Sequence, residues 1–160
     1  MRSLFHSFKY ALLGIIYCIR NERNMRIHLT AALYVLFFSR FFALTPGQFA
    51  VLMLTVSMVV VCEMVNTSIE AIVNLVSPCY NRLAKIAKDV AAGAVLVCAL
   101  ASIGIGLAFF WKPDRWEALI GYFAANLPAL LILLAVTGFA VLFIFLGPDR
   151  LFGTGRRPRK

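Results

Sequence analysis

The chain has 160 residues, of which 62% are hydrophobic and only 14% are charged. This usage lies far from that of soluble globular domains, so it excludes an ordinary water-soluble protein and indicates a membrane protein. The net charge of +9 comes from basic residues between apolar runs. We therefore expect these residues at a membrane surface, and we expect no nucleic-acid partner.

The first 20 residues predict an amphipathic helix on the membrane surface. Over residues 3–20, apolar side chains recur at three- and four-residue spacing, with polar side chains on the other faces. We expect this helix to lie in the interface rather than to cross the bilayer. The opening also lacks a compact apolar core followed by a small-residue cleavage site, so we predict no removable signal peptide.

Four apolar runs follow, and each predicts a transmembrane helix. A bilayer core of about 30 Å requires about 20 helical residues, and the runs lie at residues 27–44, 49–75, 89–111 and 122–146. The fold class is therefore an all-α integral membrane protein. We divide it into a core domain at residues 1–112 and an extra transmembrane helix with a basic tail at residues 113–160.

The basic residues predict the orientation of the chain. With the N-terminus in the cytoplasm, all but three of the 16 Lys and Arg residues fall on the inner side. The exceptions are Arg40, Lys112 and Arg115. We therefore expect a multi-pass protein with both termini in the cytoplasm.

The cysteines and histidines do not indicate a metal or disulfide site. The four cysteines have unrelated spacings and form no CxxC pair, and neither histidine accompanies them. We expect no disulfide framework and no zinc site. The residues are Cys18, Cys62, Cys79, Cys98, His6 and His28.

A stripe of polar residues lies in the segment VCEMVNTSIEAIVN, residues 61–74. At about 100° per helical residue, Glu63, Asn66, Glu70 and Asn74 share one face. The 18 residues from Thr45 to Glu63 rise about 27 Å, which is nearly the thickness of the hydrocarbon core. The stripe therefore reaches the inner interface at Glu63 and continues beyond it.

Other charged residues are expected at the same depth. Counted back from Phe110, Asp89 and its neighbour Lys88 lie about 31 Å away, and Glu22 precedes the first span on the same side. Ionisable residues in such positions are costly and usually mark function. The alternative is that the acids join helices by pairing with basic residues, but pairing explains one acid better than a stripe. The candidate partners are Lys85, Lys88 and Arg26.

Several carboxylates beside a lysine at a membrane surface favour magnesium and phosphate chemistry. Hard oxygen ligands hold Mg²⁺ while it bridges substrate phosphates, and a lysine adds a positive charge. Phosphoryl transfer is therefore the natural reaction class. The chain has no GxxxxGK[ST] loop and no protein-kinase glycine loop, so neither common nucleotide-binding fold is predicted.

Three segments carry a family resemblance. NERNMRIH, CEMVNTSIEAIVN and LAKIAKDVAAGAVL, in this order, resemble the small integral-membrane lipid kinases of bacteria, the diacylglycerol kinase and undecaprenol kinase family. The similarity covers about residues 7–110. It implies ATP with Mg²⁺, a homotrimer with sites shared between subunits, and an active site on the cytoplasmic side of the bacterial membrane.

The same resemblance implies a role for each candidate residue. Glu63 is the general base on the lipid hydroxyl, and Asn66 stands beside it. Glu22 and Glu70 hold the metal that bridges the ATP phosphates. Lys88 contacts phosphate, and Asp89 places Lys88 or the nucleoside. A carboxylate at an apolar boundary also suits a base on physical grounds.

The chain departs from the family pattern in two places. Asn74 stands where many relatives have an aspartate, and the span at residues 122–146 is additional to the three of the core family. The tail FGTGRRPRK resembles the approach to a fused lipid phosphatase, but the PSGH-type segment is absent, so we predict no phosphatase activity. We expect the kinase to survive removal of residues 122–160.

The sequence leaves alternatives open for the lipid substrate and for the class of protein. The segments around NERNMRIH and LAKIAKD look closer to undecaprenol kinases, so we prefer undecaprenol, with diacylglycerol as the alternative. A small proton-coupled transporter is the alternative from another class. A transporter needs its acid near the bilayer midplane, whereas these acids gather at the inner edge.

Overall fold

The computed structural model describes residues 2–153, and it confirms the all-α class. Within those residues there is no β-strand. The elements in chain order are α1 (Arg2–Asn21), α2 (Arg23–Ser39), α3 (Pro46–Val76), α4 (Arg82–Phe110), α5 (Pro113–Ala125) and α6 (Leu127–Leu151).

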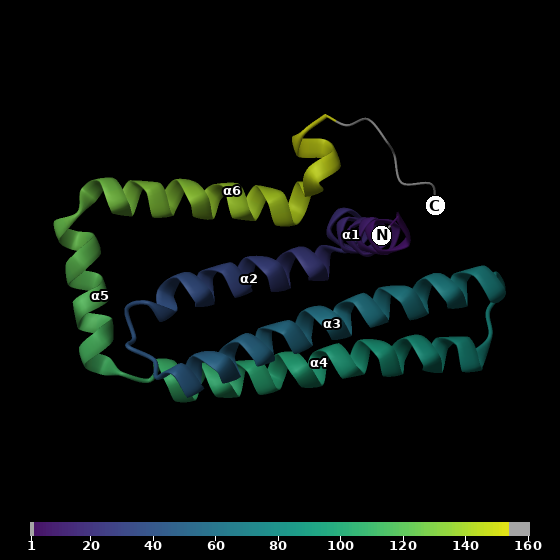
Figure 1. Ribbon diagram of the computed structural model, residues 1–160, viewed down its shortest axis with the longest axis horizontal. Helices are drawn as coiled ribbons and strands as arrows, with labels where there is room; N and C mark the ends of the chain where they lie inside the picture. The colour runs from purple at the N-terminus through teal and green to yellow at the C-terminus, as the bar shows by residue number, and fades with distance from the viewer. Residues whose placement is uncertain (1, 154–160) are drawn as a thin grey trace.

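Helices α2, α3, α4 and α6 run along the long axis of the molecule, and α1 and α5 lie across it (Figure 1). Three of the four, α3, α4 and α6, are long and apolar enough to cross a membrane. The fourth, α2, has 17 residues and rises about 26 Å. Helix α1 is seen end-on beside the start of α2, with α3 and α4 extending past it, and α5 crosses the opposite end of the molecule. The placement of α1 agrees with the surface helix expected from its periodicity.

Helix α2 ends at Ser39, before the expected residue 44, because the chain turns there to bury an aromatic ring. Phe42 is fully buried. Its ring centre lies 4.8 Å from that of Phe110 and 5.0 Å from that of Trp116. The Lys112 side chain donates a hydrogen bond to the Phe42 carbonyl at 2.8 Å. These contacts fasten the α2–α3 turn to the α4–α5 turn.

Two other boundaries also differ from the sequence-based expectation. Helix α4 begins at Arg82 rather than at residue 89, because the Asn81 side chain accepts hydrogen bonds from the Leu83 and Ala84 backbone N–H groups at 2.8 and 3.3 Å. Such a cap satisfies donors that a helix start leaves free. At the other end, residues 113–125 form the separate helix α5. Lys88 and Asp89 therefore lie on a helix and not in a loop.

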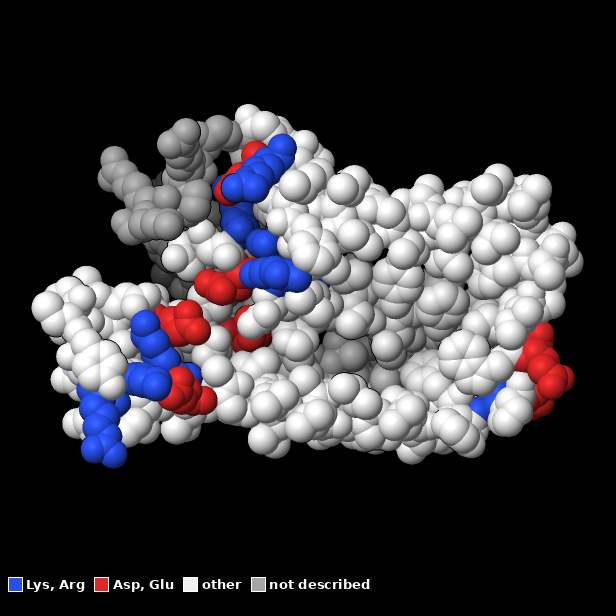
Figure 2. Space-filling model, turned by 180° about the vertical axis from the view of Figure 1, so that it is seen from behind, with Lys and Arg blue, Asp and Glu red and all other residues white. Residues whose placement is uncertain are grey.

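Charged side chains are confined to the two ends of the face seen in Figure 2. One group gathers at the end where α1 lies, and a smaller group lies at the opposite end. A wide uncharged band separates them. Such a band is what a hydrocarbon core requires of the surface that it covers.

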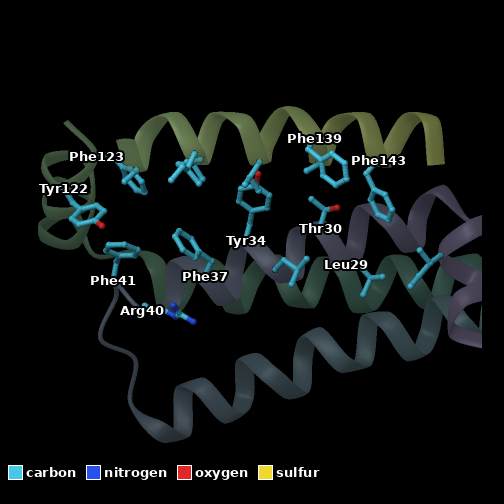
Figure 3. Close-up of a pocket in the computed structure, with 17 residues that line it drawn as sticks. Leu29, Thr30, Tyr34, Phe37, Arg40, Phe41, Tyr122, Phe123, Phe139 and Phe143 are labelled. Atoms are coloured by element: carbon cyan, nitrogen blue, oxygen red, sulfur yellow. The ribbon is translucent and has the colours of Figure 1, made fainter. Parts of the chain in front are cut away.

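Helix α6 packs along α2 and leaves an apolar groove between them (Figure 3). The groove has a volume of about 830 Å³, and Thr30 and Leu29 of α2 lie opposite Phe139 and Phe143 of α6 in it. A hydrogen bond of 2.7 Å joins the Tyr34 hydroxyl to the Thr137 hydroxyl. The additional helix is thus attached to the core.

Candidate active site

The predicted polar stripe on α3 begins at a buried, unpartnered carboxylate. Glu63 is only 1% exposed, and within residues 2–153 neither of its carboxylate oxygens has a hydrogen-bond partner. A buried carboxylate without partners is costly. Such a group therefore indicates a role beyond stability.

Asn66, one turn further along α3, contacts Glu70. Asn66 is buried, and its Nδ2 donates a hydrogen bond to Oε1 of Glu70 at 3.3 Å. Its Oδ1 has no partner in the described part of the chain. Glu63 and Asn66 thus both carry buried oxygen atoms without partners, three residues apart on one face of α3.

Glu22 reaches the same cluster from a different part of the chain. It lies between α1 and α2 and is half-buried. Burial raises the pKa of Glu22, the Glu70 carboxylate raises it further, and the Arg26 guanidinium partly offsets both. Glu22 and Glu70 also act electrostatically on Glu63. The structure thus brings three predicted carboxylates together.

The interpretation of these acids as helix-joining ion pairs finds no support in the structure. Among the residues that the structure describes, the ion pairs are Arg20 with Asp149 and Arg115 with Asp114. Neither Glu63 nor Glu70 belongs to such a pair.

Asn74 and Lys88 form a contact of their own beside the cluster. The Lys88 ammonium donates a hydrogen bond of 2.6 Å to Oδ1 of Asn74. The amide at position 74 therefore orients Lys88, although it adds no negative charge. Asp89 is exposed on α4, and among the described residues it belongs to neither of the ion pairs. Asp89 is the candidate residue that the structure leaves outside the cluster.

The carboxylates of Glu22 and Glu70 are suited to a metal ion whose other ligands are substrate phosphate and water. Within residues 2–153 no group of three or more His, Cys, Asp or Glu side chains could hold a metal ion. Mg²⁺ commonly binds through one or two carboxylates together with substrate phosphates and water. The pair Glu22 and Glu70 fits that arrangement, and it does not fit a site built from protein ligands alone.

Cys18 is a part of this region that the sequence reasoning missed. Its side chain is buried at the end of α1 and interacts with the Thr67 hydroxyl of α3. Burial raises the pKa of the Cys18 thiol, and the charges of Glu22 and Glu63 add to the rise. Cys18 therefore docks α1 onto the helix that carries Glu63. A single small apolar residue on an amphipathic helix does not indicate such a contact.

The lining of a second apolar groove includes Val59, one helical turn before Glu63. The groove has a volume of about 680 Å³ and is lined by residues of α2, α3, α4 and α5, including His28, Val56, Val59 and Trp116. Val59 precedes Glu63 by one turn on the same face of α3. An apolar chain in this groove would have its polar end near the Glu63 carboxylate.

Comparisons with known proteins match the segment that carries these residues. The family model for prokaryotic diacylglycerol kinase matches residues 9–110. The chain is 42% identical to a diacylglycerol kinase of Synechocystis sp. strain PCC 6803 over 112 residues. These residues cover 69% of this chain and 64% of that protein. It is 38% identical to the undecaprenol kinase of Bacillus subtilis strain 168 over 110 residues. These residues cover 69% of this chain and 89% of that protein.

The match with the cyanobacterial relative covers a little less than two thirds of that protein. No solved structure matches the chain. The family match ends at the last residue of α4, so it includes every candidate site residue and excludes α5 and α6.

Proposed function

This chain belongs to the prokaryotic diacylglycerol kinase family, and on that basis we propose that it is an ATP-dependent lipid kinase. It transfers the γ-phosphate of ATP to the hydroxyl group of a membrane lipid. The observation that carries the proposal is the buried Glu63 carboxylate, which has no partner in the described chain and follows by one helical turn Val59, a residue that lines an apolar groove. A lipid alcohol supplies both an apolar chain for the groove and a proton for the carboxylate.

In this reaction Glu63 acts as the general base. Its carboxylate takes the proton of the lipid hydroxyl while the hydroxyl oxygen bonds to the γ-phosphorus and ADP leaves. Asn66 orients the hydroxyl through its unused Oδ1. General-base catalysis contributes about 10²- to 10⁴-fold to a rate, and positioning contributes much of the remainder.

The ATP phosphates belong on the solvent side of Glu63. Glu22 and Glu70 hold Mg²⁺, which neutralises phosphate charge when bound. Lys88, held by Asn74, contacts phosphate, and Asp89 places Lys88 or the nucleoside. We place this end of the molecule and both termini in the cytoplasm, because most basic residues lie on that side.

For the lipid, we propose undecaprenol rather than diacylglycerol. The two relatives do not separate these substrates, since each name occurs once at similar identity. The groove favours an alcohol with a plain hydrocarbon chain. Its hydroxyls on Thr55 and Ser102 already donate to carbonyls of their own helices, at 2.6 and 2.8 Å. They are therefore not available to the ester carbonyls of diacylglycerol, which are left without these partners.

We also propose a homotrimer whose sites are shared between subunits. The support is that Asp89 is exposed and, among the described residues, forms no ion pair within its own chain. A neighbouring copy offers a place for it.

The test is phosphate transfer by the purified full-length protein in mixed micelles. Mg·ATP is supplied with undecaprenol or diacylglycerol in parallel, and labelled lipid is counted. We expect transfer to undecaprenol to be faster. Faster transfer to diacylglycerol rejects the substrate, and transfer to neither lipid rejects the kinase. Glu117→Gln, at an exposed acid of α5, controls for removal of a carboxylate elsewhere.

A further inference from the structure

The α1–α2 elbow, defined as residues 19–26, positions Glu22 with very little chain. Glu22 is the one residue between the two helices, and its backbone is extended, with φ −102° and ψ 119°. Its side chain makes no capping hydrogen bond to the start of α2. The direction of the Glu22 carboxylate therefore depends on the angle between α1 and α2, and on the contacts that hold this angle.

Arg26 holds the elbow from inside. Its side chain is buried, with 7% exposed, and its Nη1 donates to the carbonyls of Ile19 and Arg20 at 3.1 Å each. The last carbonyls of a helix lack donors within the helix and carry partial negative charge, so a cation is well placed there. Its Nε donates to the carbonyl of Ile144 in α6 at 3.2 Å. One side chain thus joins α1, α2 and α6.

The Ile144 carbonyl can accept this bond because a proline follows four residues later. In an unbroken helix it would accept from the N–H of residue 148, but Pro148 has no N–H. Gly147 breaks the helical path with φ +72°, a conformation that favours glycine. A Cβ at Gly147 would lie 3.5 Å from the Arg26 guanidinium. That distance is an ordinary contact, so glycine is favoured here by its positive φ. The Gly-Pro pair therefore ends the regular helix and leaves the Ile144 carbonyl free to accept from Arg26.

The other two arginines of the elbow contact the same end of α6. The Nε atom of Arg20 lies 3.6 Å from Oδ1 of Asp149, and the Arg23 guanidinium lies 4.3 Å from the centre of the Phe145 ring. Single surface contacts of these kinds are weak. The three arginine contacts together hold the end of α6 against the residues on both sides of Glu22.

We propose that the end of α6, residues 144–149, positions Glu22 for metal binding, with Arg26 as the positioning residue that acts through the elbow. This inference rests on the proposed role of Glu22 in the kinase. Helix α6 lies outside the residues that the family model matches, so that matched region does not contain this contact. This inference predicts the opposite of the sequence-based expectation for removal of residues 122–160: the kinase should be impaired, because the removal strips a partner from the buried Arg26 guanidinium.

The test compares two proline variants of the full-length protein in lipid nanodiscs. Pro148→Ala restores an N–H that competes with Arg26 for the Ile144 carbonyl. Pro128→Ala is the matched control, since Pro128 stands in the first turn of α6, where an N–H has no helical partner. We expect Pro148→Ala to raise the Mg²⁺ concentration for half-maximal phosphate transfer about tenfold. The KM for the lipid and the results for the control should not change.

A second variant and a second readout make the result decisive. Arg26→Lys keeps the charge but loses the planar fork that reaches three carbonyls, so it should raise the Mg²⁺ requirement too. Amide hydrogen exchange across residues 19–26 should quicken in both variants and not in the control. A parent protein that phosphorylates no lipid rejects the proposed function, while the exchange rates still test the α6 contact. Unchanged exchange, an unchanged Mg²⁺ requirement, or an equal rise in lipid KM overturns the inference.

Discussion

Replacing Glu63 with glutamine should make this protein more stable and far less active. The introduced amide cannot accept the proton of the lipid hydroxyl, so we expect the turnover number to fall by about 10²- to 10⁴-fold. The side chain keeps its size, so the groove beneath it and the neighbouring residues of α3 need not move.

The gain in stability follows from the surroundings of Glu63. The change removes a buried charge that Glu22 and Glu70 repel, and the introduced amide can donate to Oδ1 of Asn66, which has no partner in the described chain. A neutral hydrogen bond contributes about 0.5 to 1.5 kcal/mol. We therefore expect the free energy of unfolding to rise by about 1 kcal/mol, which corresponds to about 2 to 4 °C in Tm for a chain of this size.

The assay is phosphate transfer and thermal unfolding of the same preparations in one detergent. Glu117→Gln should change neither quantity, because Glu117 is exposed on α5. Full activity of Glu63→Gln would show that Glu63 is not the base. Loss of activity together with loss of stability would show that Glu63 supports the fold, and the reasoning from its unpartnered oxygens would be wrong.

Three further predictions concern pH, topology and assembly. Burial and then the Glu70 carboxylate raise the pKa of Glu22, and a protonated carboxyl does not bind Mg²⁺. The Mg²⁺ concentration for half-maximal phosphate transfer should therefore rise as the pH falls through that raised pKa. A concentration that stays constant until ordinary glutamates protonate contradicts this prediction. A membrane-impermeant maleimide should label the exposed Cys79 from the cytoplasmic side alone. Cys18, which is buried and has a raised thiol pKa, should stay unmodified. Labelling of Cys79 from outside would show that the predicted topology is wrong. Glu63→Gln and Asp89→Asn subunits should each be inactive alone. If neighbouring subunits share each site, an equal mixture should recover about a quarter of the parent activity, because about one site in four receives an intact residue from both subunits. A mixture without activity places each site within one chain.

The polar stripe of α3 was predictable because helical periodicity alone determines it. Glu63, Asn66 and Glu70 share a face at any tilt of the helix, and the rise from Thr45 sets their depth. The approach of Glu22 also followed from the order of the apolar runs. Local spacing along one chain carried these parts of the site.

The contacts of Arg26 were not predictable in the same way. They depend on a carbonyl 118 residues away in the sequence and on the backbone turn at Gly147 that exposes it. The early end of α2 likewise depends on where Phe42 finds Phe110 and Trp116. Tertiary packing decides such features, and no periodicity in the sequence reports them.

The aromatic contacts of Phe42 also determine where the core can move. Since they fasten α2 to the α3–α4 hairpin at one end, relative tilting of these elements pivots there, and displacement grows toward the opposite end. Glu63 lies about 27 Å along α3 from that pivot. A tilt of only about 5° therefore moves its carboxylate by about 2 Å, as a short hinge motion does, and leaves the outer turns in place. A lipid alcohol can thus enter and leave through small rotations of rigid helices.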